Sequence, residues 1–105
     1  MRLRAPFLRL VLRNSFMELE MNGVVVFAEV GKRGLYAEVY VEDVGYVFEK
    51  GRWTVYGGDG KSRSITEEDA KRLKNLAKRL STLPNYTVLE LLVKALYSVE
   101  AKARA

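Results

Sequence analysis

The sequence predicts an α+β fold in which an antiparallel β-meander of five or six strands is followed by two C-terminal α-helices packed on one face of the sheet. Residues 1–60 consist of short extended segments separated by turn residues, and their apolar positions share one register. Residues 61–105 show helical spacing instead. With 105 residues, of which 49% are hydrophobic, the chain is expected to form a single domain around one core.

Turn residues divide the first half of the chain into five strands in series. The strongest signal is Asn22-Gly23, because both residue types tolerate the positive φ angles of a type I′ hairpin turn. Further turns are expected at Gly31–Gly34, at Asp43-Val44 and at Lys50-Gly51. The turn at Asp43-Val44 is predicted to place Val41 opposite Tyr46, and the Lys50-Gly51 turn to place Phe48 opposite Trp53.

These turns agree about which side chains share a face of the sheet. A slip of one residue would move all the apolar side chains of a strand to the opposite face, so the agreement is a strong internal test. One face is predicted to carry no charge: Met17, Leu19, Met21, Val24, Val26, Ala28, Val30, Leu35, Ala37, Val39, Val41, Tyr46, Phe48, Trp53 and Val55. The other face is predicted to carry Glu18, Glu20, Glu29, Glu38, Glu42 and Glu49 among Phe16, Val25, Phe27, Tyr36, Tyr40, Val47 and Tyr56.

The segment PFLRLVLR at residues 6–13 fits two interpretations. As an amphipathic helix it would have its proline in the first turn. As a strand that turns at Asn14-Ser15 it would place Arg9 across from Glu20, which is a favourable pair. We favour the strand, because its register extends the same apolar face.

Two helices are predicted in the second half. Thr66 is typical of an N-cap with Asp69 three residues later, so the first helix is expected to run from about Glu67 to Leu80. The second begins at about Val88, and its apolar side chains recur at three- and four-residue spacing at Leu89, Leu92, Leu96, Val99 and Ala103. We interpret Leu89, Leu92, Leu96 and Val99, here called the C-terminal seam, first as core packing and alternatively as a homodimer contact.

The composition excludes most catalytic chemistry. The chain has no cysteine and no histidine, which excludes thiolate catalysis, disulfides, zinc sites of the Cys/His kind and imidazole acid–base chemistry. The carboxylates are not spaced like those of a metal-binding loop, and GGDGKSRS lacks the spacing of a phosphate-binding loop. We therefore expect no enzyme activity, no metal and no cofactor.

The first residues, MRLRAPFLRLVLRNSF, begin like a signal peptide. Arg9 and Arg13 interrupt the apolar stretch, however, and no small-residue cleavage site follows. No apolar run approaches the roughly 20 residues of a membrane-spanning helix. The sequence therefore predicts a cytoplasmic protein without a membrane segment.

Charge and aromatic residues indicate an anionic partner. The net charge is +5; residues 1–15 carry four Arg and no acid, and residues 61–105 carry ten basic and five acidic groups. Bases stack on aromatic rings while cations neutralise phosphates, so rings beside cations suit single-stranded DNA or RNA of any sequence. The predicted binding residues are Phe48, Lys50, Arg52, Trp53, Tyr56, Lys61 and Arg63. The glutamate-bearing face ranks second because its carboxylates repel phosphate, and a homo-oligomeric protein-interaction module is the alternative function.

The layout also resembles a known family. A small basic chain without Cys or His, an antiparallel sheet, the stretch YVFEKGRWTVY and the Leu-spaced helix VLELLVKALYSVEA are together similar to the ThermoDBP family and its relatives from hyperthermophilic archaea. The resemblance covers the layout of the whole chain and includes no diagnostic motif. It implies sequence-independent binding of single strands in an apolar cleft lined by basic residues, and a helical C-terminal dimer contact. The segment after Leu89 is shorter than the family's zipper, which is a departure from the pattern.

Overall fold

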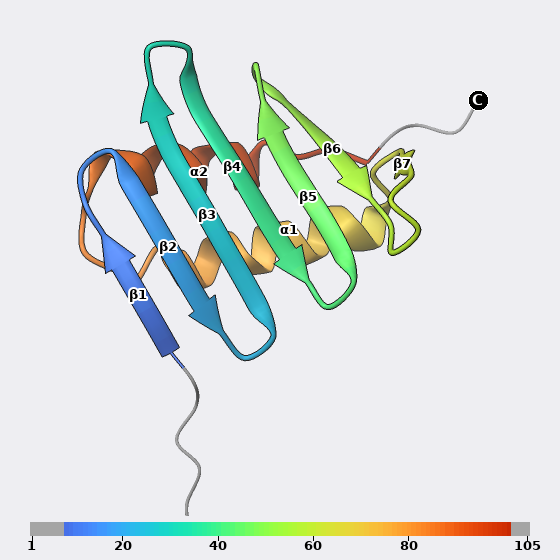
Figure 1. Cartoon of the computed structure of the whole chain (residues 1–105), viewed down its shortest axis with the longest axis horizontal. Coiled ribbons are helices and arrows are strands. Elements are labelled where there is room, and N and C mark those ends of the chain that lie inside the picture. The colour runs from blue at the N-terminus through green and yellow to red at the C-terminus, as the bar shows by residue number, and fades with distance from the viewer. Residues whose placement is uncertain (1–7, 102–105) are drawn as a thin grey trace, which may run out of the picture.

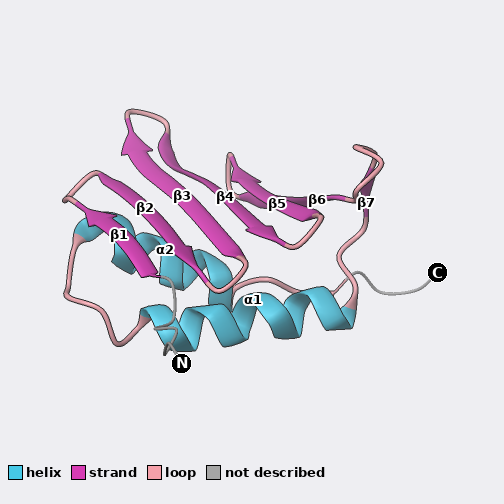
Figure 2. Cartoon of the chain, turned by 60° about the horizontal axis from the view of Figure 1, so that its bottom comes forward, coloured by secondary structure: helices cyan, strands magenta, loops and turns pink. Residues whose placement is uncertain are grey.

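The computed structural model describes residues 8–101 and confirms the α+β class. One antiparallel sheet has its strands in sequential order, and both helices lie on one of its faces, as Figure 1 and Figure 2 show. The strands are β1 (Leu8–Leu12), β2 (Phe16–Met21), β3 (Val24–Gly31), β4 (Gly34–Val41), β5 (Val44–Glu49), β6 (Arg52–Tyr56) and β7 (Ser62–Arg63). The helices are α1 (Glu67–Leu80) and α2 (Thr87–Tyr97).

The Asn22-Gly23 turn has the predicted backbone conformation. Asn22 and Gly23 have φ angles of 46° and 84°, as a type I′ turn requires, and Phe48 lies opposite Trp53. The prediction for the β4–β5 turn is wrong by two residues, because Val41 pairs with Val44 rather than with Tyr46. The turn is centred one residue earlier than predicted, at a glutamate that adopts a positive φ. A shift of two residues leaves the side chains within both strands on their predicted faces, whereas Glu42 lies in the turn between them.

The first and last strands of the sheet differ in part from the prediction. The first strand is β1, in which Arg9 lies opposite Glu20, so the strand interpretation is confirmed for residues 8–12 and the helical one is wrong. Residues 6 and 7 lie outside the described part of the chain, as does Ala103. At the other end, the predicted five or six strands become seven because residues 57–61 form a turn that returns the chain along β6 as β7.

The core lies between the uncharged face of the sheet and the two helices. Buried side chains of the sheet are Met17, Leu19, Val26, Ala28, Ala37, Val39, Tyr46 and Val55. They pack against buried helical side chains that include Leu73, Leu76, Leu80, Val88 and Leu92. None of the helices in residues 8–101 is long and apolar enough to cross a membrane.

The C-terminal seam belongs to this core. All four of its side chains are buried within a single chain, where α2 lies against β2, β3 and β4. The exposed apolar side chains of α2 are instead Leu91 and Tyr97, on the side away from the sheet. A homodimer contact through the seam would therefore require α2 to leave the sheet.

A buried carboxylate joins α1 to the sheet. Asp69 accepts hydrogen bonds from Tyr46 Oη at 2.7 Å, from Arg63 Nη1 at 2.6 Å and from the Thr66 backbone N–H at 2.9 Å. The Thr66 hydroxyl accepts from the Asp69 N–H, which completes the predicted capping box. Burial alone would raise the pKa of the Asp69 carboxyl, but these hydrogen bonds outweigh burial and hold the pKa well below its usual range.

Asp69→Asn is expected to lower the free energy of unfolding by about 3 kcal/mol at neutral pH, because the buried Tyr46 hydroxyl and the Arg63 guanidinium lose a charged acceptor. Arg63 is half-exposed, so water compensates part of its loss. Since folding lowers the pKa of Asp69, its ionisation stabilises the fold above about pH 4 and progressively less as the pH falls below that value. Denaturant unfolding at several pH values measures both effects.

The control for this substitution is Glu67→Gln, which removes an exposed carboxylate from the same turn of α1. It should change the free energy of unfolding by less than about 1 kcal/mol. Equal stability of Asp69→Asn and the parent at neutral pH would show that the network does not hold α1 to the sheet.

Candidate nucleic-acid interface

The edge of the sheet at β6 is only half covered. Val55 and Tyr56 pair with β7, whereas no strand in residues 8–101 pairs with the outer side of Arg52–Thr54. β7 is only two residues long, because the chain leaves the sheet after Arg63 to begin α1. Backbone groups of the segment that contains Trp53 therefore face the space beside the sheet.

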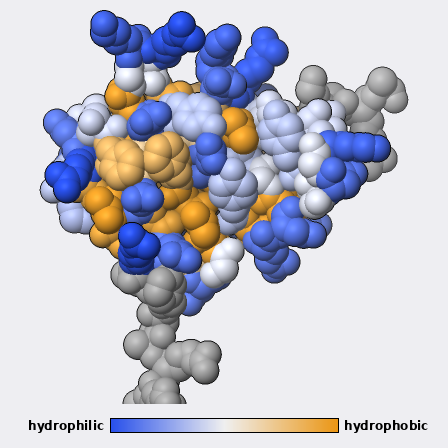
Figure 3. All heavy atoms as spheres, in the orientation of Figure 1, coloured by the Kyte–Doolittle hydropathy of each residue, from blue (hydrophilic) through white to orange (hydrophobic). Residues whose placement is uncertain are grey.

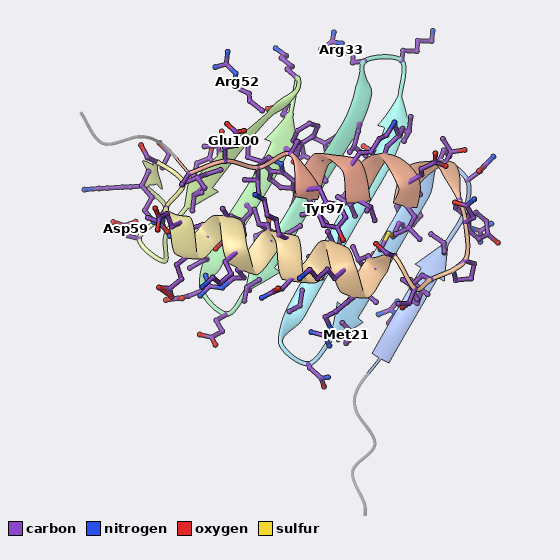
Figure 4. The ribbon with its side chains drawn as sticks, turned by 180° about the vertical axis from the view of Figure 1, so that it is seen from behind. Met21, Arg33, Arg52, Asp59, Tyr97 and Glu100 are labelled. Atoms are coloured by element: carbon purple, nitrogen blue, oxygen red, sulfur yellow. The ribbon has the colours of Figure 1, made fainter. Side chains whose placement is uncertain are left out.

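This space is a cleft of about 740 Å³. Its walls are the open half of β6, the connection from β7 to α1, and the chain that follows α2. Figure 4 shows Arg52 and Glu100 near each other at this end of the molecule. The lining residues are Gly51, Arg52, Trp53, Thr54, Ser62, Arg63, Ser64, Ile65, Ser98, Val99, Glu100 and Ala101.

Trp53 forms the aromatic wall of the cleft and is held in a fixed orientation. Its indole Nε1–H donates a hydrogen bond of 2.9 Å to the carbonyl oxygen of Ala95 in α2. Its ring packs against Phe48 with 5.1 Å between the ring centroids. The side chain is only partly buried, so one part of the ring packs on the core and another faces the cleft. Phe48 packs against Trp53 and is not among the residues that line the cleft.

Three of the predicted cations are available near the cleft. Lys50, Arg52 and Lys61 are exposed, and within residues 8–101 they form no ion pair. Arg52 lines the cleft, while Lys50 lies in the β5–β6 turn and Lys61 in the turn before β7. Arg63 also lines the cleft, but its guanidinium is bound to Asp69. The hydrogen bond with Asp69 raises the pKa of Arg63. This guanidinium therefore stabilises the fold and is less available to a ligand than the other three cations.

Tyr56 does not join the other predicted residues. Alternation along β6 places its side chain on the face opposite to Trp53, where it is 39% exposed. The predicted residues are therefore divided into three groups. Trp53, Arg52 and Arg63 line the cleft, and Lys50 and Lys61 are the chain neighbours of the lining residues Gly51 and Ser62. Tyr56 lies on the face of the sheet opposite the helices.

Sequence reasoning missed the wall that follows α2. Ser98 caps the C-terminus of α2, and its hydroxyl donates a hydrogen bond of 2.8 Å to the carbonyl oxygen of Ala95. The next residues then run past β6 and bring Glu100 into the cleft. No local pattern in the sequence indicates this placement, because it depends on the direction in which α2 crosses the sheet. Glu100 adds a negative charge to an otherwise basic site.

The described residues contain no group of three side chains that could hold a metal ion. Comparisons of the chain with protein-family models, with curated proteins and with solved structures find no match. The resemblance to the ThermoDBP family therefore stays a prediction, and function has to be inferred from the chemistry of the cleft.

Proposed function

We propose that the protein binds single-stranded DNA or RNA without sequence preference, in the cleft beside Trp53. The observation that carries this proposal is a fixed, partly open indole ring in a cleft of about 740 Å³. Arg52 lines the cleft, Lys50 and Lys61 are next to lining residues in the sequence, and none of the three forms an ion pair within residues 8–101. A cytoplasmic location and the absence of catalysis belong to the same proposal.

The chemistry of the cleft suits an unpaired nucleotide. Every base has a π-face, so stacking on Trp53 would contribute about 1–3 kcal/mol per base without selecting a sequence. The cations would neutralise phosphates of the same strand and release counterions. The hydroxyls of Ser62, Ser64 and Ser98 and the open edge of β6 supply further hydrogen-bonding groups. A duplex presents no free base face, so it should bind more weakly.

The charge of the cleft predicts a specific dependence on salt. Replacing Lys50, Arg52 and Lys61 together by Gln should weaken binding of a thymidine oligonucleotide and of a mixed-sequence oligonucleotide alike. If each cation contacts one phosphate, the slope of log Kd against log salt should fall by about 2, since each contact on a single strand contributes about 0.7. Fluorescence anisotropy of labelled oligonucleotides over a series of salt concentrations measures both quantities.

The matched control removes the same charge from the outer side of α1, with Lys71, Lys74 and Lys78 replaced by Gln. This variant should keep a slope close to that of the parent, with only a small loss of affinity from the lower net charge. If the two triple variants lose affinity and slope equally, the cleft is not the binding site.

A further inference from the structure

No helix or strand within residues 8–101 covers the face of the sheet opposite the helices, as Figures 1 and 3 show. We call it the open face. Its side chains include Arg9, Phe16, Glu18, Glu20, Val25, Phe27, Glu29, Tyr36, Glu38, Tyr40, Val47, Glu49, Arg52 and Tyr56. A solvated face of an antiparallel sheet usually carries mainly polar side chains. Here aromatic and aliphatic side chains are interspersed with carboxylates, and Val25, Tyr40 and Tyr56 are each about 40% exposed.

Carboxylates and apolar side chains alternate across the central strands. Three cross-strand rows run from β2 through β3 to β4: Phe16–Glu29–Tyr36, Glu18–Phe27–Glu38 and Glu20–Val25–Tyr40. In the first two rows each carboxylate has apolar neighbours across the sheet. Phe16 and Phe27 also contact each other edge to face, with centroids 5.3 Å apart. The open face therefore carries negative charges that are separated from one another by apolar side chains.

Among the carboxylates of the open face, Glu38 accepts two side-chain hydrogen bonds. Tyr36 donates a hydrogen bond of 2.5 Å to one of its oxygens, and Tyr40 donates one of 2.6 Å to the other. These two bonds lower the pKa of Glu38, and the same bond from Tyr36 raises the pKa of that phenol to about 12. Each carboxylate oxygen retains a lone pair for a further donor. The Tyr40 ring lies over Gly45, where an added Cβ would be 3.1 Å from the ring, so a larger residue at position 45 would have to displace it.

The charge of the open face is opposite to that of the chain. Its strands carry Glu18, Glu20, Glu29, Glu38 and Glu49 against Arg9 and Arg52, whereas the whole chain has a net charge of +5. The carboxylates among these rings repel phosphate, so a nucleic acid strand is disfavoured here. A ligand that matches this surface has to bring cations to the carboxylates and flat, weakly hydrated groups to the rings.

Arginine has both properties. Its guanidinium forms paired hydrogen bonds with a carboxylate, stacks on aromatic rings and is more weakly hydrated than the ammonium of lysine. Its aliphatic stem can also cover apolar side chains. A small hollow of about 80 Å³ between β1 and β3 has the size of a side-chain end; its lining includes the carboxylates Glu18 and Glu20, the ring of Phe27 and one cation, Arg9.

We propose that the open face binds an arginine-rich segment of a partner protein. The stacking site in the cleft is separate from the open face, because Trp53 lies on the helical face of β6; only the edge strand, with Arg52 and Thr54, borders both. The inference therefore does not depend on the proposed nucleic-acid binding, and each can fail without the other.

The test uses a fluorescently labelled hexa-arginine peptide and a hexa-lysine peptide of the same charge. The parent should bind hexa-arginine several times more tightly than hexa-lysine. Replacing Glu18, Glu20 and Glu29 together by Gln leaves the Tyr–Glu38 bonds intact and should weaken hexa-arginine binding by at least about tenfold. Glu38→Gln alone should also weaken it, by about threefold or more. Circular dichroism melting verifies that both variants fold.

The matched control replaces Glu67, Glu68 and Glu90 on the helical side by Gln and should bind within about twofold of the parent. Equal weakening of both triple variants, equal affinity for the two peptides, or no binding to the parent would overturn the proposal. Tyr40→Ala distinguishes the ligand class: it should weaken the peptide and leave oligonucleotide affinity unchanged. The reverse result would make the open face a nucleic-acid surface and would overturn the proposal as well.

Discussion

Leu92→Glu combined with Leu96→Glu is expected to unfold the protein rather than to produce a folded monomer. Both side chains are fully buried between α2 and the sheet. Each substitution places a carboxylate without a partner in the core, and each costs several kcal/mol. A domain of this size has a total stability of about 5–15 kcal/mol, so the two changes together should exceed it or nearly so. Circular dichroism and size-exclusion chromatography measure the outcome.

The control introduces the same charges on the other side of the same helix. Leu91→Glu combined with Tyr97→Glu changes side chains that are 36% and 44% exposed; Figure 4 labels Tyr97, seen from the helical side. This variant should remain folded, with a stability change of about 1 kcal/mol or less. A folded protein from the Leu92 and Leu96 variant would contradict the assignment of the C-terminal seam to the core, and a mass below that of the parent would identify the seam as a subunit contact.

Trp53→Ala should have two separable effects. The ring packs on Phe48 and donates a hydrogen bond to Ala95, so its removal should lower the free energy of unfolding by about 3 kcal/mol. If a base stacks on the open part of the ring, affinity of the folded protein for a single strand should also fall by about 1–3 kcal/mol. Denaturant unfolding measures the first effect, and anisotropy under conditions where the variant is folded measures the second.

Two further variants separate packing from binding. Trp53→Phe keeps an aromatic ring but loses the hydrogen bond to Ala95, so stability should fall by about 1 kcal/mol with affinity nearly unchanged. Phe48→Ala removes the ring behind Trp53, which does not line the cleft, and should lower stability more than affinity. If Trp53→Ala keeps the affinity of the parent, the indole serves packing alone.

Most of the sheet could be predicted because its signals are local. Asn22-Gly23 and Lys50-Gly51 fix their hairpins through backbone preferences, and alternation along each strand then determines the faces. The predicted register of β4 and β5 was wrong because the turn could be placed at Glu42-Asp43 or at Asp43-Val44. The structure has the turn at Glu42-Asp43, where Glu42 adopts a positive φ that is unusual for a glutamate. β7 was missed because its two polar residues carry no alternation; only pairing with Tyr56 and Val55 defines it.

The candidate site could be predicted only in part. Alternation and strand order placed Trp53 opposite Phe48 near the edge of the sheet. The ion pair of Arg63 with Asp69 could not be predicted, although the capping role of Asp69 was, because no sequence pattern reveals which basic side chain reaches a buried carboxylate. The approach of Glu100 to β6 depends on how α2 packs. On the open face, the alternation of Glu and aromatic residues was predicted, but the bonds from Tyr36 and Tyr40 to Glu38 were not.

The most direct test of binding in the cleft is the emission of Trp53, the only tryptophan in the chain, during titration with a single-stranded oligonucleotide. Binding in the cleft predicts quenching that saturates at the concentration at which anisotropy saturates, that is weaker with duplex of the same length, and that is reversed by added salt. Oligonucleotide binding seen by anisotropy, with Trp53 emission and its accessibility to acrylamide both unchanged, would contradict a binding site at Trp53.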